Sequence, residues 1–516
     1  MDWDSAGNIC LSFNLQKRVM LGLALIIGAY SYCILLLGLL HSLNYSYVLF
    51  VTILFILIAS ISHYKKILKT LIFLKEEVLT FGKIEIFFIL LILLTSMVNL
   101  IGALGPELSF DALWYHLTIP KLFITSESVY FIKGELLYYS LWPKLTEMLY
   151  TASLIFGNEI LAKLIHFTFG ILTTVIVYKI ARLYIPRFYS IVASLIFYSN
   201  LVVSWLSITA FVDLTRSFYE AIALLYFLKY TKDLKKKNFI LSAILLGFAI
   251  YSKLLSVGSI LIFVFLLFFI KKTSVKKKFK NITLYSLISL LIPLPYFLIS
   301  YFYTGNPFYP LFAKLSSSYF TLELLNPLNF VKSLLTVFLF SPDPINPVYF
   351  IVLPFLIFSF RKIVLKTKYL FLFAIISIFV FYFTPQTGGG RFVVAYLPAF
   401  SVLSAVYIAN SRKVVQKILL VAVAIIAIMT ISYRFAANLR FVPVVLGYQT
   451  KNDFLMHNLN FSFGDFYDEN DAIRKIVGND KVLVLGIHNL YYIDFPFTIP
   501  EWGGAGNEKY TLIYSL

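Results

Sequence analysis

Residues 84–104 read IEIFFILLILLTSMVNLIGAL, an apolar run long enough to cross the hydrocarbon core of a bilayer as one helix. A membrane-spanning helix takes about 20 predominantly apolar residues. The rest of the chain repeats this pattern, because 60% of its 516 residues are hydrophobic and only 13% are Asp, Glu, Lys or Arg. Soluble domains carry roughly 25% of these charged residues. The composition therefore excludes a soluble globular protein and a disordered one, and it predicts a polytopic membrane protein.

We expect an all-α polytopic fold with about thirteen transmembrane helices, each of roughly 20 residues. Residues 1–434 form the transmembrane domain, which contains two large outer loops, 105–159 and 303–346, and residues 435–516 form a small tail. Residues 238–270 are one apolar run broken at Tyr251-Ser252-Lys253, so they form two short spans or a re-entrant pair. The predicted spans are 19–40, 45–63, 84–104, 160–183, 188–204, 211–229, 238–252, 255–270, 281–302, 347–360, 369–384, 392–410 and 418–434.

The formal charge of +19 comes from clusters of Lys and Arg between the apolar runs. Cytoplasmic loops carry an excess of basic residues, so these clusters place their loops inside, in contact with anionic lipid headgroups. The loops without clusters, including 105–159 and 303–346, are then outside. This alternation would break if the apolar segment 142–156 crossed the membrane, and we therefore assign that segment to the outer interface. The charge pattern gives no reason to expect nucleic acid as a partner.

The same alternation predicts a multi-pass protein of the plasma (inner) membrane with a cytoplasmic N-terminus and an extracytoplasmic tail. The first apolar run is too long for a cleavable signal peptide and lacks a clear cleavage site, so we expect it to be the first span. The tail is more polar than the rest of the chain. Its segment 468–477 is typical of a short helix and 481–486 of a buried strand, which predicts a small α/β appendage.

The first large outer loop, 105–159, mixes aromatic and charged residues as interfacial helices packed on membrane spans do. It contains FDALWYHL at 110–117, WPK at 142–144 and EMLY at 147–150. Asp111 follows the third predicted span at the outer membrane boundary, where a carboxylate costs energy unless it is hydrated, paired or used. Two interpretations are open: Asp111 caps the helix that follows, or it is a functional carboxylate.

Several motifs, taken in order, resemble the GT-C superfamily of membrane glycosyltransferases, in particular the bacterial branch similar to protein O-mannosyltransferases and aminoarabinose transferases. The superfamily carries an acidic residue in the first large outer loop, and Asp111 matches it. Many relatives have a second acid directly after the first, where this chain has Ala112. This departure argues against a metal site built on an acidic pair, and participation of a divalent cation stays open. The matching motifs are DALWYHLTIPKLF at 111–123, LGFA at 246–249 with YSK at 251–253, TGNPFYP at 304–310, and GRF at 390–392 with Leu397-Pro398.

The resemblance implies that a sugar is transferred from a polyprenyl-phosphate-linked donor to a hydroxyl of a lipid, glycan or protein on the outer face, with inversion. Asp111 is then the candidate general base, since a positioned carboxylate can accept the proton of the hydroxyl. The leaving phosphate needs cations where its charge develops. Lys253, a basic residue in an apolar run, and Arg391, whose guanidinium can form two parallel hydrogen bonds, are the candidates. Their alternatives are a snorkelling lysine and an interface anchor.

Two further phosphate contacts and one acceptor contact are proposed in the first outer loop. His116 is expected on Asp111 or on the phosphate, or else as a packed histidine. Lys121 is expected on the phosphate or on lipid headgroups. Glu147 is expected to orient the acceptor or to pair with Lys144.

Two more acids are candidates for the acceptor side or for support of the site. Asp213 either lies near the active cavity or caps the span that starts near residue 211, and the cap is the preferred interpretation. Asp343, in the second large outer loop, is either a second acid or part of a turn between Pro342 and Pro344. Arg216 and Glu220 are four residues apart on one span, and this spacing predicts an ion pair within the membrane.

Two other functions fit the composition. One is a lipid or polysaccharide transporter, or flippase, which would place polar residues near the membrane midplane and often shows repeats. The other is an O-antigen-type polymerase, whose key residues are usually arginines in large outer loops. In this chain the polar motifs lie in outer loops that are poor in arginine. The sequence has neither the HExxH and CxxC spacings of metal sites nor a Walker loop, so we expect the lipid donor itself to supply the energy.

Overall fold

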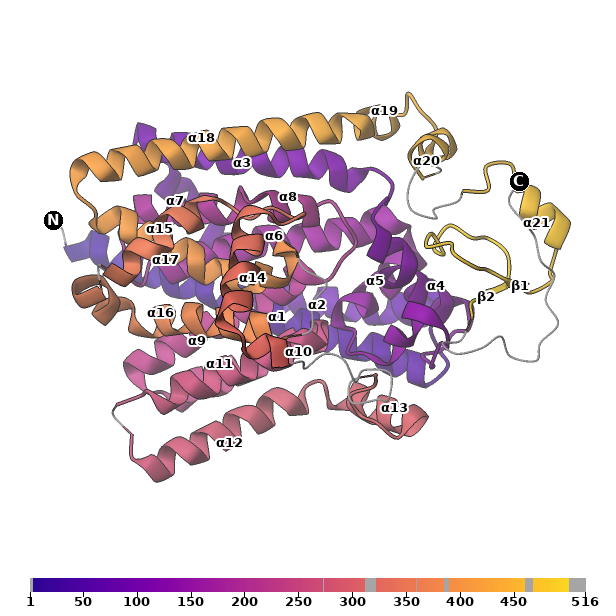
Figure 1. The fold of residues 1–516 in the computed structure, drawn as a ribbon, viewed down its shortest axis with the longest axis horizontal. Coiled ribbons are helices and arrows are strands. Elements are labelled where there is room, and N and C mark those ends of the chain that lie inside the picture. The colour runs from indigo at the N-terminus through magenta and orange to yellow at the C-terminus, as the bar shows by residue number, and fades with distance from the viewer. Residues whose placement is uncertain are drawn as a thin grey trace.

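The computed structural model describes residues 3–271, 273–310, 322–358, 360–384, 389–459 and 467–500 of the chain. Long helices lie side by side, with α3 and α18 along one edge and α12 along the opposite edge, and the C-terminal tail projects at one end (Figure 1). The long membrane-type helices are α1 (Trp3–Leu39), α2 (Tyr45–Val78), α3 (Lys83–Leu104), α6 (Glu159–Ala181), α9 (Asp213–Asp233), α10 (Lys236–Ser252), α12 (Val275–Leu291), α16 (Phe360–Phe383), α17 (Leu397–Asn410) and α18 (Lys413–Asn438).

Within the described residues, seven helical segments are long and apolar enough to cross a membrane, and a bent pair would make eight. The chain is therefore a multi-pass membrane protein with a mostly helical fold. In the part of the chain that the structure describes, each range that we predicted as a span overlaps one or two helices, while the number of thirteen spans stays a prediction. The shorter helices include α7 (Arg187–Tyr198), α8 (Leu201–Leu206), α11 (Val257–Phe268), α13 (Leu294–Thr304), α14 (Pro327–Leu339) and α15 (Val348–Phe358).

Two predicted spans are broken helices, and local chemistry explains each break. The range 281–302 is α12 followed by α13, which bend by 66° at Pro293, a residue that has no amide hydrogen to continue a helix. The range 188–204 is α7 followed by α8. Asn200 separates them, because its side-chain amide donates to the carbonyls of Ile196 (2.7 Å) and Phe197 (2.9 Å), which are end groups that the helix itself leaves unsatisfied.

The first large outer loop is helical, as predicted, and packs into the bundle. It holds the π-helix η1 (Ala112–His116), α4 (Thr118–Thr125), the 3₁₀ helix η2 (Glu135–Leu141) and α5 (Leu145–Phe156). Residues 145–153 of α5 are all buried, against α1, α4 and α6. The apolar character of this segment is therefore explained by protein contacts.

A charged network lies inside the membrane-type bundle on α9. Arg216 and Glu220 form the predicted ion pair, with 2.8 Å between Nε and Oε1, and both side chains are buried. The hydroxyls of Ser256 and Ser259 each donate to Glu220 at 2.8 Å, and Arg216 donates to the Tyr396 hydroxyl at 3.1 Å. These hydrogen bonds satisfy the pair, as buried charges require.

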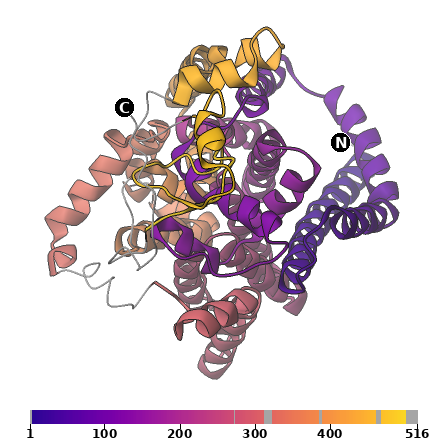
Figure 2. The same cartoon turned by 90° about the vertical axis from the view of Figure 1, so that its right-hand side faces the viewer.

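The tail holds short elements: α20 (Lys451–Leu459), α21 (Ala472–Val477) and two parallel strands, β1 (Val482–Leu483) and β2 (Phe497–Thr498). The helix predicted at 468–477 begins only at Ala472, because the Asp468 carboxylate accepts the amide hydrogens of Ala472 (2.9 Å) and Ile473 (3.0 Å) and so ends the turn before it. The strand predicted at 481–486 shortens to two residues. Viewed from this end, the tail lies over the first outer loop (Figure 2).

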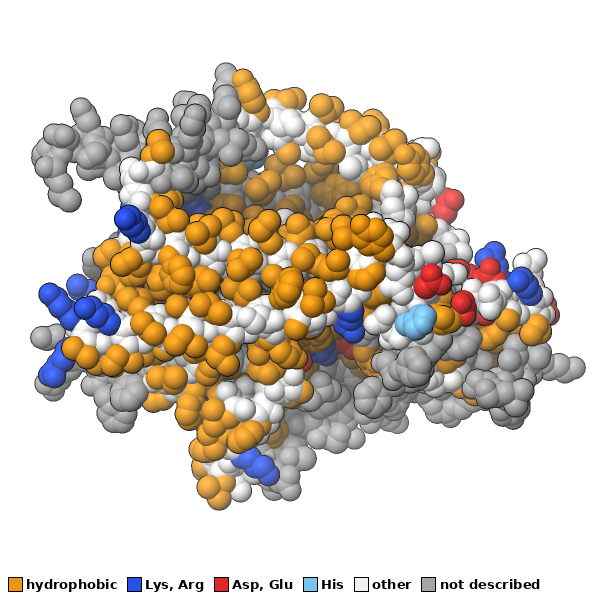
Figure 3. Space-filling view, turned by 90° about the horizontal axis from the view of Figure 1, so that it is seen from above, with side chains coloured by type: hydrophobic (Ala, Val, Ile, Leu, Met, Phe, Trp, Pro, Cys, Tyr) orange, Lys and Arg blue, Asp and Glu red, His pale blue; other side chains and the backbone are white. Residues whose placement is uncertain are grey.

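The surface carries its charges at the two ends of the bundle. Apolar side chains cover the middle, Lys and Arg gather at the end away from the tail, and Asp and Glu gather at the tail end (Figure 3). The apolar middle includes strongly exposed residues such as Phe50 and Met97. Lys and Arg side chains also lie at the tail end (Figure 3), and the outside location of the tail stays a prediction.

Cysteine labelling tests this orientation. In a chain with Cys10→Ser and Cys33→Ser, a Thr125→Cys variant is expected to react with an impermeant maleimide added to intact cells, because Thr125 is exposed at the end of α4. A Lys413→Cys variant, exposed at the start of α18, is the control and should react only after the membrane is opened. The reverse pattern would overturn the predicted orientation.

Candidate active site

Asp111 is paired with a residue 280 positions away in the sequence. Its Oδ2 lies 2.6 Å from Nη1 of Arg391, and the two side chains are 13% and 19% exposed. Asp111 precedes η1, and Arg391 lies in the 3₁₀ helix η6 (Gly390–Tyr396). Asp111 makes no capping hydrogen bond to η1, so the cap interpretation is wrong for its side chain.

A second ion pair joins Asp213 and Lys253, with 2.6 Å between Oδ1 and Nζ. Lys253 has an extended backbone after α10 and before the 3₁₀ helix η3 (Leu254–Ser256), so the apolar run 238–270 is interrupted where we predicted. Asp213 begins α9, where Val212 holds the N-cap position without a side-chain cap bond. The preferred cap interpretation of Asp213 is therefore wrong, because the carboxylate turns to the ammonium of Lys253 instead.

The two ion pairs form one group, which we call the charged cluster: Asp111, Asp213, Lys253 and Arg391. The Arg391 guanidinium lies 5.3 Å from the ring centres of both Phe211 and Phe392. The Lys253 ammonium lies 5.6 Å from the ring centre of Phe392, so both cations face one aromatic ring. One Asp213 oxygen, Oδ2, is buried and has no hydrogen-bond partner.

Asp343 packs against the backbone that carries Arg391. A Cβ on Gly390 would lie 2.2 Å from the Asp343 carbonyl oxygen, and one on Gly389, whose φ is +96°, would lie 2.6 Å from Asp343 Oδ2. Only glycine permits this approach. Burial raises the pKa of Asp343, the positive charge of Arg391 opposes the rise, and the nearby charges of Asp213 and Asp111 add to it. The third carboxylate thus adjoins the charged cluster.

His116 and Glu147 form a separate buried group beside the charged cluster. Glu147 Oε1 lies 3.0 Å from His116 Nδ1 and 3.2 Å from Lys144 Nζ, and its Oε2 is buried without a hydrogen-bond partner. The His116 ring packs on Phe211, with 5.7 Å between centres. His116 therefore pairs with Glu147 and not with Asp111, and the predicted alternative contact between Glu147 and Lys144 is present.

Lys121 does not join the charged cluster. Its ammonium donates to the carbonyl oxygens of Tyr491 (2.8 Å) and Ile493 (2.6 Å) and lies 3.5 Å from a carboxylate oxygen of Asp494. All three partners belong to the tail. The structure thus assigns Lys121 a contact that we did not predict, and its predicted phosphate contact has no geometric support.

Tyr115 is a site residue that sequence reasoning missed. Its side chain interacts with Asp111, and burial, together with the negative charge of Asp111, raises the pKa of its hydroxyl well above the ordinary value. Tyr115 lies four residues after Asp111. It belongs to the π-helix η1, and Asp111 directly precedes that helix. Single π turns are frequent at functional sites. The sequence signal was an aromatic hydroxyl one turn after the candidate base.

A small cavity lies next to the charged cluster. Its lining is mostly apolar, yet it includes the guanidinium of Arg216 and the hydroxyls of Thr384 and Tyr396. Phe392, which faces both cations of the cluster, is part of the wall. The lining residues are Arg216, Leu255, Phe381, Thr384, Phe392 and Tyr396.

Among the residues that the structure describes, no group of three His, Cys, Asp or Glu side chains is arranged to hold a metal ion. Two of the three acids near the site face cations, Asp111 facing Arg391 and Asp213 facing Lys253. Each of these two carboxylates is therefore paired with a basic side chain.

Comparison with known proteins places this geometry in context. Residues 148–299 match the family described as dolichyl-phosphate-mannose-protein mannosyltransferase. No curated protein sequence matches the chain.

Two of the matched solved structures are of one enzyme. ArnT from Cupriavidus metallidurans bound to undecaprenyl phosphate aligns over 81% of this chain and 86% of its own, with a TM-score of 0.53 and 14% identity. The apo state of ArnT aligns over 80% and 85%, with a TM-score of 0.50 and 14% identity. An oligosaccharyltransferase from Archaeoglobus fulgidus matches more weakly, at a TM-score of 0.46, 13% identity and 68% and 56% coverage.

The match to the mannosyltransferase family covers the region from α5 to α13, which holds Asp213 and Lys253. The ArnT alignment shows a shared fold over most of both chains. The resemblance inferred from the motifs is thereby confirmed: the chain resembles ArnT in fold over most of its length and, over residues 148–299, resembles the protein mannosyltransferase family.

Proposed function

We propose that this protein transfers a sugar from a polyprenyl-phosphate-linked donor to a hydroxyl acceptor on the extracytoplasmic face of the membrane. The observation that carries the proposal is the charged cluster, in which four segments far apart in sequence bring two carboxylates and two cations together. The likeness in fold to ArnT, solved with undecaprenyl phosphate, supports a donor of this class. The mannosyltransferase match supports sugar as the transferred group.

In the proposed reaction, Asp111 accepts the proton of the acceptor hydroxyl. The acceptor oxygen forms a bond to the anomeric carbon, and the bond between that carbon and the phosphate oxygen breaks with inversion. The electron pair leaves on the phosphate of the lipid carrier. Arg391 and Lys253 stabilise this charge as it develops, an effect that grows in a site shielded from water.

The ion pair between Asp111 and Arg391 suggests how the base becomes available. While Arg391 Nη1 lies 2.6 Å from Asp111 Oδ2, that oxygen is occupied by the ion pair and does not face the acceptor hydroxyl. A donor phosphate competes for the same guanidinium, which binds phosphate with two parallel hydrogen bonds. Binding of the donor thus releases Asp111 Oδ2 toward the acceptor, so the base is free only when a lipid phosphate occupies Arg391.

The cavity beside the charged cluster has a volume of about 10 Å³, which is room for about one water molecule and too little for an isoprene unit of the carrier. Leu255, Phe381 and Phe392 form its apolar wall, and Phe392 also lies beneath both cations. Glu147 and Asp343, which adjoin the charged cluster, are candidates for orienting the acceptor.

Mass spectrometry of lipids that copurify with the protein tests the donor class. We expect a polyprenyl phosphate, or its glycosylated form, in preparations of the wild-type chain, and a strongly reduced amount in the variant Arg391→Ala. A preparation that holds only bulk phospholipid, even after incubation with undecaprenyl phosphate, would contradict the proposal. Transport of an intact lipid-linked sugar into the outer leaflet of proteoliposomes, without transfer, would favour the transporter instead.

A further inference from the structure

Four residues of the tail segment 488–493 contact the first outer loop on both sides of Asp111: His488, Tyr491, Tyr492 and Ile493. We call residues 488–493 the clamp segment. The segment follows β1 and precedes β2. Its contacts fall on loop positions from 107 to 121, so they bracket the candidate base.

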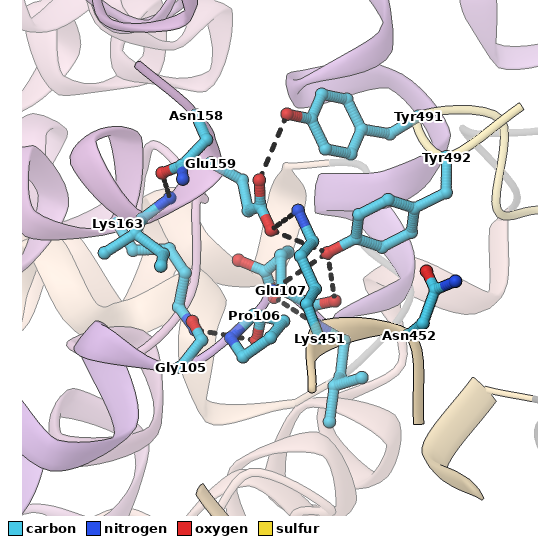
Figure 4. Close-up of polar contacts among 12 residues, drawn as sticks. Gly105, Pro106, Glu107, Asn158, Glu159, Lys163, Lys451, Asn452, Tyr491 and Tyr492 are labelled. Atoms are coloured by element: carbon cyan, nitrogen blue, oxygen red, sulfur yellow. Dashed lines mark hydrogen bonds and ion pairs between the residues drawn. The ribbon is translucent and has the colours of Figure 1, made fainter. Parts of the chain in front are cut away.

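On the N-terminal side of Asp111, the clamp segment acts through Tyr492 (Figure 4). The Tyr492 hydroxyl accepts the amide hydrogen of Glu107 at 3.1 Å and lies 3.2 Å from Glu159 Oε1. Glu159 is fully buried and also pairs with Lys451 of α20 at 2.6 Å. The buried Glu159 carboxylate therefore holds the tail to the start of α6. The Tyr492 hydroxyl, which contacts this carboxylate, also holds the loop at Glu107.

The start of the loop is also held by a residue of α6. Lys163 of α6 is buried, and its ammonium donates to the carbonyl oxygens of Gly102 (2.9 Å), Gly105 (2.6 Å) and Pro106 (3.0 Å). These carbonyls belong to the end of α3 and the residues after it. The start of the loop therefore lies between the Lys163 ammonium and Tyr492 of the tail.

Close to Asp111, the clamp segment contacts two aromatic residues of the loop through His488. Its ring centre lies 4.4 Å from that of Phe110 and 4.5 Å from that of Trp114. Phe110 directly precedes Asp111, and Trp114 is in the following turn. One aromatic ring from the tail thus contacts a residue just before the carboxylate and a residue in the turn just after it.

On the C-terminal side of Asp111, the contacts are hydrogen bonds to backbone atoms. The Tyr491 amide donates to the Leu113 carbonyl oxygen at 3.0 Å. Lys121 donates back to the carbonyl oxygens of Tyr491 and Ile493. The loop and the clamp segment therefore each supply donors to the other.

We propose that the clamp segment positions Asp111, with His488 and Tyr492 as positioning residues. The proposal rests on the proposed function, since it concerns the base of that reaction. Asp111 lies in a turn of the loop, between η1 and the end of α3, and the clamp segment restrains the turn from its solvent side. A displacement of a catalytic group by as little as 1 Å can change a rate about 100-fold. A restraint on the position of Asp111 therefore affects the rate of sugar transfer.

The test is a set of matched variants assayed for sugar transfer. His488→Ala is expected to lower kcat by ~10- to 100-fold with the donor KM unchanged, because Lys253 and Arg391 lie on other segments. His488→Phe should restore most of kcat, since the contact is a ring stack. Tyr492→Phe should also lower kcat. The controls are His457→Ala, whose ring contacts the Asp453 carbonyl oxygen within α20, and Tyr448→Phe, an exposed residue.

A second measurement keeps the proposal separate from the proposed function. Amide hydrogen exchange of peptides from 105–116 should speed up in His488→Ala and Tyr492→Phe and stay unchanged in both controls, whether or not any sugar is transferred. Wild-type protein that transfers no sugar would end the proposed function alone. Unchanged exchange and unchanged kcat, or a failure of His488→Phe to rescue, would overturn the positioning role. If His488→Ala does not fold, Tyr492→Phe decides between these outcomes.

Discussion

Asp111→Asn is expected to abolish sugar transfer while the binding of polyprenyl phosphate stays intact or becomes tighter. An amide cannot accept the proton, and loss of a general base typically costs a factor of about 10²–10⁴ in rate. The same change removes the anion that holds Arg391 at 2.6 Å. The freed guanidinium can then bind phosphate without first giving up a partner, and we expect the Kd for undecaprenyl phosphate to fall by up to ~10-fold, or about 1.4 kcal/mol.

Two assays check this result: transfer from a lipid-linked sugar in membranes, and binding of undecaprenyl phosphate to purified protein. Asp480→Asn is the matched control, because it makes the same change at an exposed tail position and should alter neither assay. Full transfer activity in Asp111→Asn would end the role of Asp111 as base. Weaker phosphate binding would contradict the competition between Asp111 and the phosphate for Arg391.

Lys253→Ala is expected to reduce both stability and donor affinity, for two separable reasons. It leaves the buried Asp213 carboxylate without its partner at 2.6 Å, and breaking a buried pair in this way costs about 3–5 kcal/mol. It also removes one of the two cations proposed for the phosphate. Thermal unfolding in detergent measures the first effect, and binding of undecaprenyl phosphate measures the second.

The double variant Lys253→Ala/Asp213→Asn separates these effects. The neutral amide removes the uncompensated charge, so the unfolding temperature should recover while donor affinity stays low. Lys332→Ala, at an exposed position of α14, is the control for loss of a lysine outside the charged cluster. Wild-type donor affinity in the double variant would show that Lys253 serves only to neutralise Asp213.

The helices were predictable from apolar runs, because lipid and protein interior both select the same side chains. The breaks within them were harder to predict. Pro293 predicts a bend from sequence alone, but the break at Asn200 depends on side-chain hydrogen bonds to the preceding turn. The interruption at Lys253 was visible, since a lysine in a run such as 238–270 has few structural explanations.

The candidate residues were predictable one by one, but their partners were not. Asp111 directly precedes η1 and Asp213 begins α9, so local rules favour caps, whereas the structure pairs each with a cation from a distant segment. Such pairings depend on how segments pack. Lys121 illustrates the same limit, because its partners are carbonyl oxygens of the tail, and any residue type could have supplied them.

The charged cluster is balanced at rest, with one carboxylate facing each cation. A dissolved inorganic anion would have to give up its hydration and also displace a carboxylate, for little net gain. A phosphate tethered to a membrane lipid arrives already confined near the site, and confinement raises its effective concentration to the millimolar range or above. In the proposed reaction, the neutrality of the charged cluster therefore disfavours free phosphate from the medium and favours a phosphate carried by a membrane lipid.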